Sequence, residues 1–119
     1  MRRTARDQIA PYITKDGSEI RELLHPDRHA VRQQSLAEAV VAPGATTRLH
    51  RHDTTEEIYH VTRGSGLLTL AAETFAIAVG DSILIAPGTA HCVTNTGGEP
   101  LHILCCCAPA YTDADTVLL

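Results

Sequence analysis

Short apolar runs alternate with turn-forming residues along most of the chain. The runs are bounded by Gly, Pro, Asp and Asn, and several alternate apolar with polar residues. This rhythm predicts an all-β fold, and closing the strands into a barrel would remove exposed sheet edges. The expected strands are residues 19–23, 46–52, 57–62, 66–70, 74–79, 82–85, 90–94 and 101–106. Residues 30–41 fit this pattern poorly, because their Ala, Gln, Glu and Leu content favours helix for part of the segment.

Chemistry-bearing residues fall in two spaced blocks. Residues i and i+2 of a strand point to the same face, so His50 and His52 can both reach one cation. A polar turn at 53–55 can bring Glu57 back to the same ion, and His91 would come from a later strand. Three imidazoles and one carboxylate form a plausible set for a divalent metal. The blocks read Gly44-x5-His50-x-His52-x4-Glu57-x6-Gly64 and Gly80-x5-Ala86-x-Gly88-x2-His91-x3-Asn95.

The two blocks resemble the paired signature motifs of the cupin superfamily. The first block, 44–64, is in register throughout, and the second, 80–95, departs at Ala86, where that motif usually has proline. The resemblance implies a cupin-type double-stranded β-helix, or jelly-roll barrel, forming a single domain over 1–119. It also implies metal binding by His50, His52, Glu57 and His91. Similar small cupins carry a strand before the first motif, which favours strand over helix for 35–41.

The nature of the metal stays open at this point. A single His or Glu on a strand is usually a surface or hydrogen-bonded residue, and only the joint spacing of the four favours a site. Four protein ligands leave two positions of an octahedral ion free for water, substrate or oxygen. Iron, manganese, zinc and nickel all suit such ligands. The remaining histidines are expected to be solvated or hydrogen bonded, and they are His25, His29, His60 and His102.

Two further residues are candidates for catalysis beside the metal. Arg48 lies two residues before His50, so strand alternation places it on the inward face, where a guanidinium could clamp a substrate carboxylate. The alternative interpretation is that Arg48 is a surface residue at the mouth of the barrel. Tyr59 shares the face of Glu57 and could donate a hydrogen bond to a metal-bound oxygen, or simply pack. Asn95 has the parity of His91, but a turn-stabilising role suits it better.

Composition limits the partners. The 119 residues carry 10 basic and 14 acidic side chains, giving a net charge of −4, so no basic surface favours nucleic acid. The expected partner is a small-molecule substrate. The positively charged residues near the start of the chain are not followed by an apolar run, so we expect neither a signal peptide nor a membrane anchor. We therefore expect a cytoplasmic protein. The cysteines lack a C-x-x-C spacing and are expected to be reduced core residues: Cys92, Cys105, Cys106 and Cys107.

Three functions remain compatible with these features. The first is a metal-dependent enzyme, dioxygenase-like, acting on a small polar or acidic substrate. The second is a non-oxidative sugar isomerase, epimerase or lyase, and the third is a non-catalytic module that binds a small molecule or stores metal. The family resemblance implies a homodimer, to which the apolar end at 116–119 could contribute by strand exchange, unless it is a disordered tail.

Overall fold

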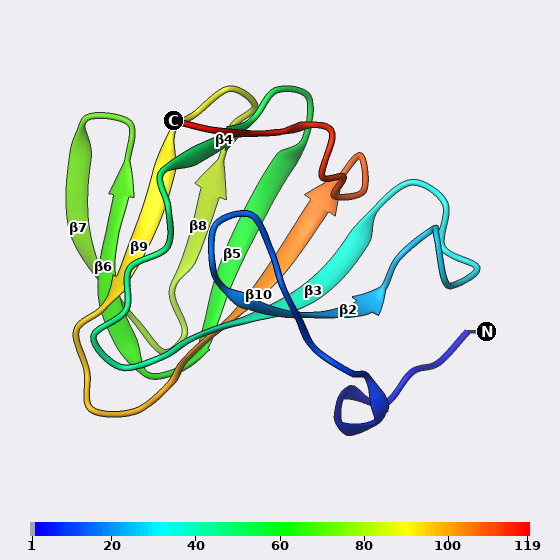
Figure 1. The fold of residues 1–119 in the computed structure, drawn as a ribbon, viewed down its shortest axis with the longest axis horizontal. Helices are drawn as coiled ribbons and strands as arrows, with labels where there is room; N and C mark the ends of the chain where they lie inside the picture. The colour runs from blue at the N-terminus through cyan, green and yellow to red at the C-terminus, as the bar shows by residue number, and fades with distance from the viewer. Residues whose placement is uncertain (1) are drawn as a thin grey trace.

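Two antiparallel sheets enclose the interior of the molecule in this computed structural model, which describes residues 2–119 (Figure 1). The six-stranded sheet has the order β1-β2-β3-β10-β5-β8, and the five-stranded sheet has the order β11-β4-β9-β6-β7. The strands are β1 Tyr12–Ile13, β2 Glu19–Leu24, β3 Ser35–Val41, β4 His50–His52, β5 Glu56–Arg63, β6 Ser65–Leu70, β7 Glu73–Ala78, β8 Ser82–Ile85, β9 His91–Asn95, β10 Leu101–Ala108 and β11 Thr116–Leu118. A single 3-10 turn, Arg6–Gln8, is the helical element among these residues. The predicted double-stranded β-helix is confirmed.

Strand alternation produces the core. In β10, Leu101 and Ile103 point inward and are almost completely buried, while His102 between them faces outward. Val61 on β5 and Leu68 on β6 pack with them as part of one aliphatic cluster. Burial of such side chains stabilises the fold by about 1.5–3 kcal/mol each. These side chains contribute to holding the two sheets together.

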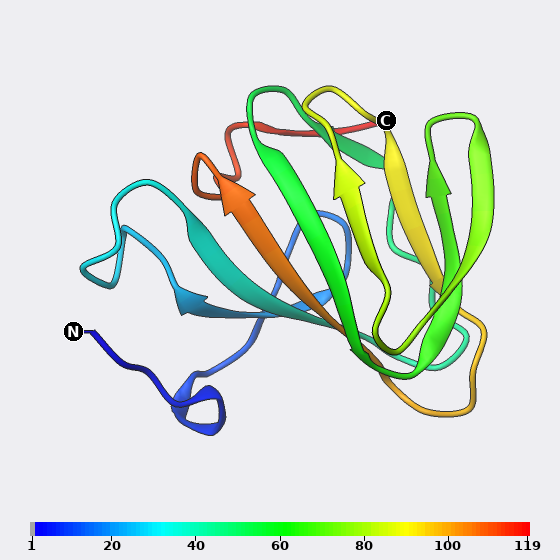
Figure 2. The same cartoon turned by 180° about the vertical axis from the view of Figure 1, so that it is seen from behind.

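Neighbouring strands bring the site residues into line. On the inner face of the six-stranded sheet, Glu57 lies between Cys107 of β10 and Ile85 of β8 in the strand register. In the other sheet, His50 of β4 is paired with His91 of β9. Seen from behind, the two sheets converge along one side of the molecule and open at the other (Figure 2). The two motif blocks of the sequence thus meet across the interior.

Two expectations about strands are corrected. The strand expected from residue 46 begins only at His50, because residues 47–49 are irregular and residue 46 forms an isolated bridge with Thr94. The C-terminal segment is not a free tail, since β11 pairs with β4 of the same chain (Figure 1). By contrast, the strand at 35–41 is confirmed as β3, paired on both sides by β2 and β10.

The cysteines are free, but not all are core residues. Cys105 and Cys107 are buried, Cys92 is half-buried and Cys106 is exposed. Alternation along β10 turns the middle thiol of the Cys105–Cys107 run away from the core. The expectation of a buried thiol is therefore wrong for Cys106.

Gly66 lies where two strands approach too closely for a side chain. A Cβ at this position would come within 2.5 Å of the backbone oxygen of Thr94 on β9. We expect Gly66→Ala to lower the free energy of unfolding by about 1–3 kcal/mol, because the paired strands must separate. Gly98→Ala is the matched control, since a Cβ there meets nothing within 4 Å. Equal denaturation midpoints for the two variants would show that the close approach of Gly66 to the Thr94 backbone does not exclude a side chain.

Candidate metal centre

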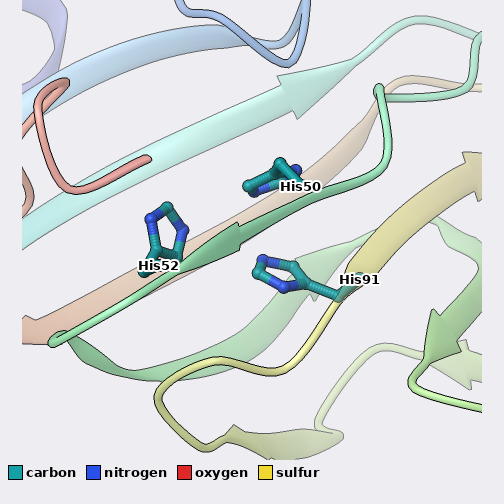
Figure 3. Close-up of side chains that lie close together, drawn as sticks. All are labelled: His50, His52 and His91. Carbon is teal, nitrogen blue, oxygen red and sulfur yellow. The ribbon is translucent and has the colours of Figure 1, made fainter. Parts of the chain in front are cut away.

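Three imidazoles converge in the interior from two strands. His50 and His52 stand on β4 and His91 begins β9 (Figure 3). One ring nitrogen of each lies within 4.8 Å of those of the other two. All three side chains are buried, with His91 fully inaccessible to solvent. Imidazole nitrogens gathered this closely can share one cation.

Hydrogen bonds fix which nitrogen of each ring faces the centre. The Nδ1 of His50 donates to the backbone oxygen of Arg48 at 2.8 Å, and the Nδ1 of His91 donates to that of Thr89 at 2.9 Å, since a carbonyl can only accept. This leaves the Nε2 lone pair of each neutral ring free. Such outer hydrogen bonds are the usual way in which a metal-binding histidine is oriented.

His52 is oriented by a threonine of the C-terminal strand. The hydroxyl of Thr116 donates to the backbone oxygen of Thr112 at 2.9 Å, so it accepts the proton of His52 Nδ1 at 3.0 Å. The pairing of β11 with β4 places Thr116 directly opposite His52. The C-terminal segment therefore belongs to the support of the site.

Glu57 approaches two of the three histidines from the opposite sheet. Its Oε1 lies 3.3 Å from His52 Nε2 and 3.5 Å from His91 Nε2. Its other oxygen, Oε2, accepts a weak hydrogen bond from the Cys107 thiol at 3.3 Å. One carboxylate oxygen is thus held away from the centre, and the other faces the imidazoles.

Unpartnered buried atoms at the centre fit a metal ion. Within residues 2–119, Glu57 Oε1 and His91 Nε2 are buried and have no hydrogen-bond partner that meets the usual geometry. A buried polar atom without a partner costs about 1–3 kcal/mol. A divalent cation bound between these atoms would satisfy both, and nitrogen and carboxylate ligands are suited to transition metals. The donor set is therefore consistent with the ligands expected from the sequence.

The surroundings favour the metal-binding protonation states. Burial alone would raise the pKa of Glu57, but the close approach of the His52 and His91 rings outweighs it and lowers the pKa to about 2. Burial, followed by repulsion from His91, lowers the pKa of His50 below 6.5. An ionised carboxylate and a neutral imidazole are the forms that bind a cation.

The lowered pKa of His50 predicts a pH effect on the metal-free protein. Below pH 6.5 the unfolded chain binds a proton at His50 more readily than the folded chain, so folding stability should fall as the pH drops from that value. The contribution is at most about 1.4 kcal/mol per pH unit. Urea denaturation of chelator-treated protein between about pH 7 and 5 measures it. We expect a shallower decline in His50→Ala, and identical slopes in both proteins would contradict the assignment.

A small cavity adjoins the histidines inside the barrel. Its free space is about 40 Å³, enough for a few water-sized groups. Ala37 and Ala39 of β3 face it with minimal side chains. Polar groups on its wall include Asp16, Glu22, Tyr59, Tyr111, Cys107 and Thr116.

Tyr59 and Arg48 have different positions relative to this cavity. Tyr59 is buried, lines the cavity and packs edge-on against His91 with ring centroids 5.9 Å apart. Burial and the charge of Glu57 raise its pKa well above 10, so the phenol keeps its proton. Arg48 is exposed and does not line the cavity. Its expected inward orientation is wrong, because the irregular residues before His50 break the two-residue alternation.

The remaining histidines lie away from the centre and form hydrogen bonds, as expected. Nδ1 of His60 contacts the Ser82 hydroxyl at 2.8 Å, and Nδ1 of His102 lies 3.4 Å from Glu38 Oε2. His25 Nε2 donates to a backbone oxygen at residue 111. Asn95 is also structural, since its amide nitrogen donates to the backbone oxygens of Val41 and Glu99.

Sequence reasoning missed two acidic residues of the cavity. Asp16 lies in a turn, where its carboxylate accepts bonds from Thr14 and Ser18, yet its Oδ2 is 3.7 Å from His50 Nε2. A turn residue gives no sequence signal for such a contact. Glu22 was detectable in principle, because it shares the inward face of β2 with buried Ile20.

The barrel of two antiparallel sheets holds a buried group of three histidines that could bind a metal. A family model for the cupin domain matches residues 37–107, which is more than half of the chain. The chain therefore belongs to the cupin family, as the two motifs suggested.

Individual relatives differ in what their names describe. The chain is 53% identical over 117 residues to an uncharacterized protein of Methanocaldococcus jannaschii, covering 98% of this chain and 94% of that protein. A predicted oxalate decarboxylase from Thermotoga maritima has a similar structure, with a TM-score of 0.77 and 25% identity over 88% of this chain and 96% of that one. The polyketide cyclase RemF from Streptomyces resistomycificus has a TM-score of 0.80 and 24% identity, covering 91% and 79%. Within residues 2–119, none of the helical structure is long and apolar enough to span a membrane.

Proposed function

We propose that the chain is a metal-dependent cupin enzyme that acts on a small, oxygen-bearing substrate. His50, His52, Glu57 and His91 would hold one divalent transition metal, whose identity among iron, manganese, zinc and nickel is undetermined. The observation that carries the proposal is the pair of unpartnered buried atoms, Glu57 Oε1 and His91 Nε2, 3.5 Å apart. When bound, such an ion supplies Lewis-acid polarisation of a substrate oxygen, and a redox-active ion also supplies oxygen chemistry.

The cavity wall favours acid–base chemistry over the dioxygenase-like alternative. Tyr59 retains its proton and lies beside the ligands, while Asp16 and Glu22 contribute carboxyl groups to the same space. Groups that hold or accept protons next to a polarised oxygen suit isomerisation, elimination or cyclisation. The name of the similar cyclase is consistent with such chemistry.

Elemental analysis tests whether the protein binds a metal and distinguishes the candidate functions. Protein purified without added metal or chelating resin should contain close to one equivalent of a transition metal, lost in His50→Ala. Stoichiometric zinc or nickel would support the non-oxidative reaction, and stoichiometric iron or manganese would favour the dioxygenase-like one. If neither protein contains metal, even after incubation with added metal, the chain would be a module that binds a small molecule without a metal.

Tyr59→Phe tests the proposed proton donor separately. The ring remains, so we expect metal content and stability to be unchanged while turnover of an identified substrate falls by about 10²-fold or more. Unchanged turnover would make Tyr59 a packing residue. A homodimer and a cytoplasmic location stay predictions, and sedimentation of the purified protein would measure the first.

A further inference from the structure

Glu22 is a buried carboxyl group that faces the metal cavity without serving as a metal ligand. Its side chain is 5% exposed and belongs to the cavity wall together with His50 and Glu57. It stands on the inward face of β2, opposite Ala37 of β3 in the strand register. The small alanine leaves the carboxyl group room to face the cavity.

Only half of this carboxyl group is satisfied. The hydroxyl of Tyr12 on β1 donates to Oε1 at 2.8 Å. Within residues 2–119, the other oxygen, Oε2, is buried and has no hydrogen-bond partner. A carboxylate has only acceptor atoms, so the group that satisfies Oε2 must bring an O–H or N–H. The structure therefore reserves one acceptor inside the cavity for a donor that the chain itself does not supply.

Electrostatics of the cavity restrict the ligand further. Asp16 and Glu57 share the wall with Glu22, and the residues that line the cavity include neither lysine nor arginine. A ligand with two ionised ends would have one end at the metal and the other among carboxylates. Like charges in a poorly solvated site repel strongly. A hydroxyl group at the second end would instead donate to Glu22.

We propose that Glu22 selects substrates that carry a hydroxyl group next to their metal-binding oxygen and disfavours dicarboxylates. The inference rests on the proposed function, since it assumes a metal held by the histidines and Glu57. It separates this chain from its structural relative, a predicted oxalate decarboxylase, because oxalate has no hydrogen-bond donor when ionised. The limited space, about 40 Å³, restricts the group reaching Glu22 to a small one.

Two small chelators test the selection. Glycolate and oxalate both carry a carboxylate that can bind the metal, but only glycolate has a hydroxyl proton at its other end. The zinc-loaded protein is titrated with each in a calorimeter, and the ratio of the two affinities is compared with that of Glu22→Gln. The amide of glutamine offers a donor to a second carboxylate while still accepting from Tyr12 or a hydroxyl. We expect the ratio to shift toward oxalate by about tenfold, the worth of one hydrogen bond in a buried site.

Controls keep the outcome interpretable. Glu19→Gln changes the same functional group on the same strand, at a side chain that is 42% exposed and outside the cavity wall, and should leave the ratio unchanged. An unchanged ratio in Glu22→Gln would overturn the proposal. If that variant does not fold, methoxyacetate replaces oxalate in the wild-type protein. It lacks the hydroxyl proton, so binding as tight as that of glycolate would overturn the proposal, and binding about tenfold weaker would support it.

The experiment distinguishes a protein that does not bind metal from one in which Glu22 does not select the ligand. Zinc content is measured before any chelator is added, and protein that holds no zinc contradicts the proposed function itself. Protein that holds zinc and binds glycolate and oxalate without regard to Glu22 contradicts only the role of this residue.

Discussion

Replacing His91 by alanine is expected to weaken metal binding by more than about 100-fold. His91 is fully buried, and within residues 2–119 its Nε2 has no hydrogen-bond partner. Glu57 Oε1 lies 3.5 Å from this nitrogen, and a bound metal would contact both atoms. Losing this ligand leaves three donors from β4 and β5 and a gap on the β9 side. Removal even of outer-shell groups commonly costs 10–100-fold in affinity. Competition against a chromophoric chelator, with zinc as the probe, measures the loss.

The matched control is His102→Ala. His102 also stands on a strand and contacts a carboxylate, Glu38, but it points away from the cavity. Its replacement should leave zinc affinity unchanged within about twofold. Circular dichroism of both variants checks that the barrel is intact. Equal zinc affinity in the two variants would contradict the ligand assignment.

Replacing Asn95 by aspartate is expected to cost about 3–5 kcal/mol of folding free energy. The amide nitrogen of Asn95 donates to the backbone oxygens of Val41 and Glu99 at 2.9 and 2.8 Å, and the side chain is 1% exposed. An aspartate would direct a buried oxygen toward two carbonyl oxygens and leave a charge uncompensated, which is among the costliest single changes.

Chemical denaturation of the metal-free protein measures this cost. Gln33→Glu makes the same amide-to-acid change at an exposed position and should alter stability by less than about 0.5 kcal/mol. A loss in Asn95→Asp no larger than in this control would show that the buried amide does not connect the loop to β3.

Much of the candidate site could be predicted from the sequence because its candidate ligands lie in regular strands. His50 and His52 are two residues apart in β4, so alternation alone places both on one face. The turn before Glu57 and the start of β9 at His91 then follow from the spacing of the two motifs. The convergence of the three histidines depends on strand pairing between β4 and β9, and Glu57 approaches them from the opposite sheet. The family pattern implied this convergence, and residue periodicity alone did not.

Irregular backbone and long-range pairing account for what sequence reasoning missed. The inward orientation of Arg48 assumed that a strand extended back from His50, but residues 47–49 do not form one. Thr116 supports His52 only because the C-terminal segment folds back along β4, and no local pattern encodes that pairing. Asp16 enters the cavity from a turn, where side-chain direction is not set by alternation.

Diffraction from crystals of the zinc-loaded protein, recorded on both sides of the zinc absorption edge, tests the central claim most directly. We expect one strong anomalous peak about 2.0–2.2 Å from Nε2 of His50, His52 and His91 and from a carboxylate oxygen of Glu57. Zinc-loaded crystals without a peak at that position, or with the peak at Asp16 and Glu22 instead, would contradict it.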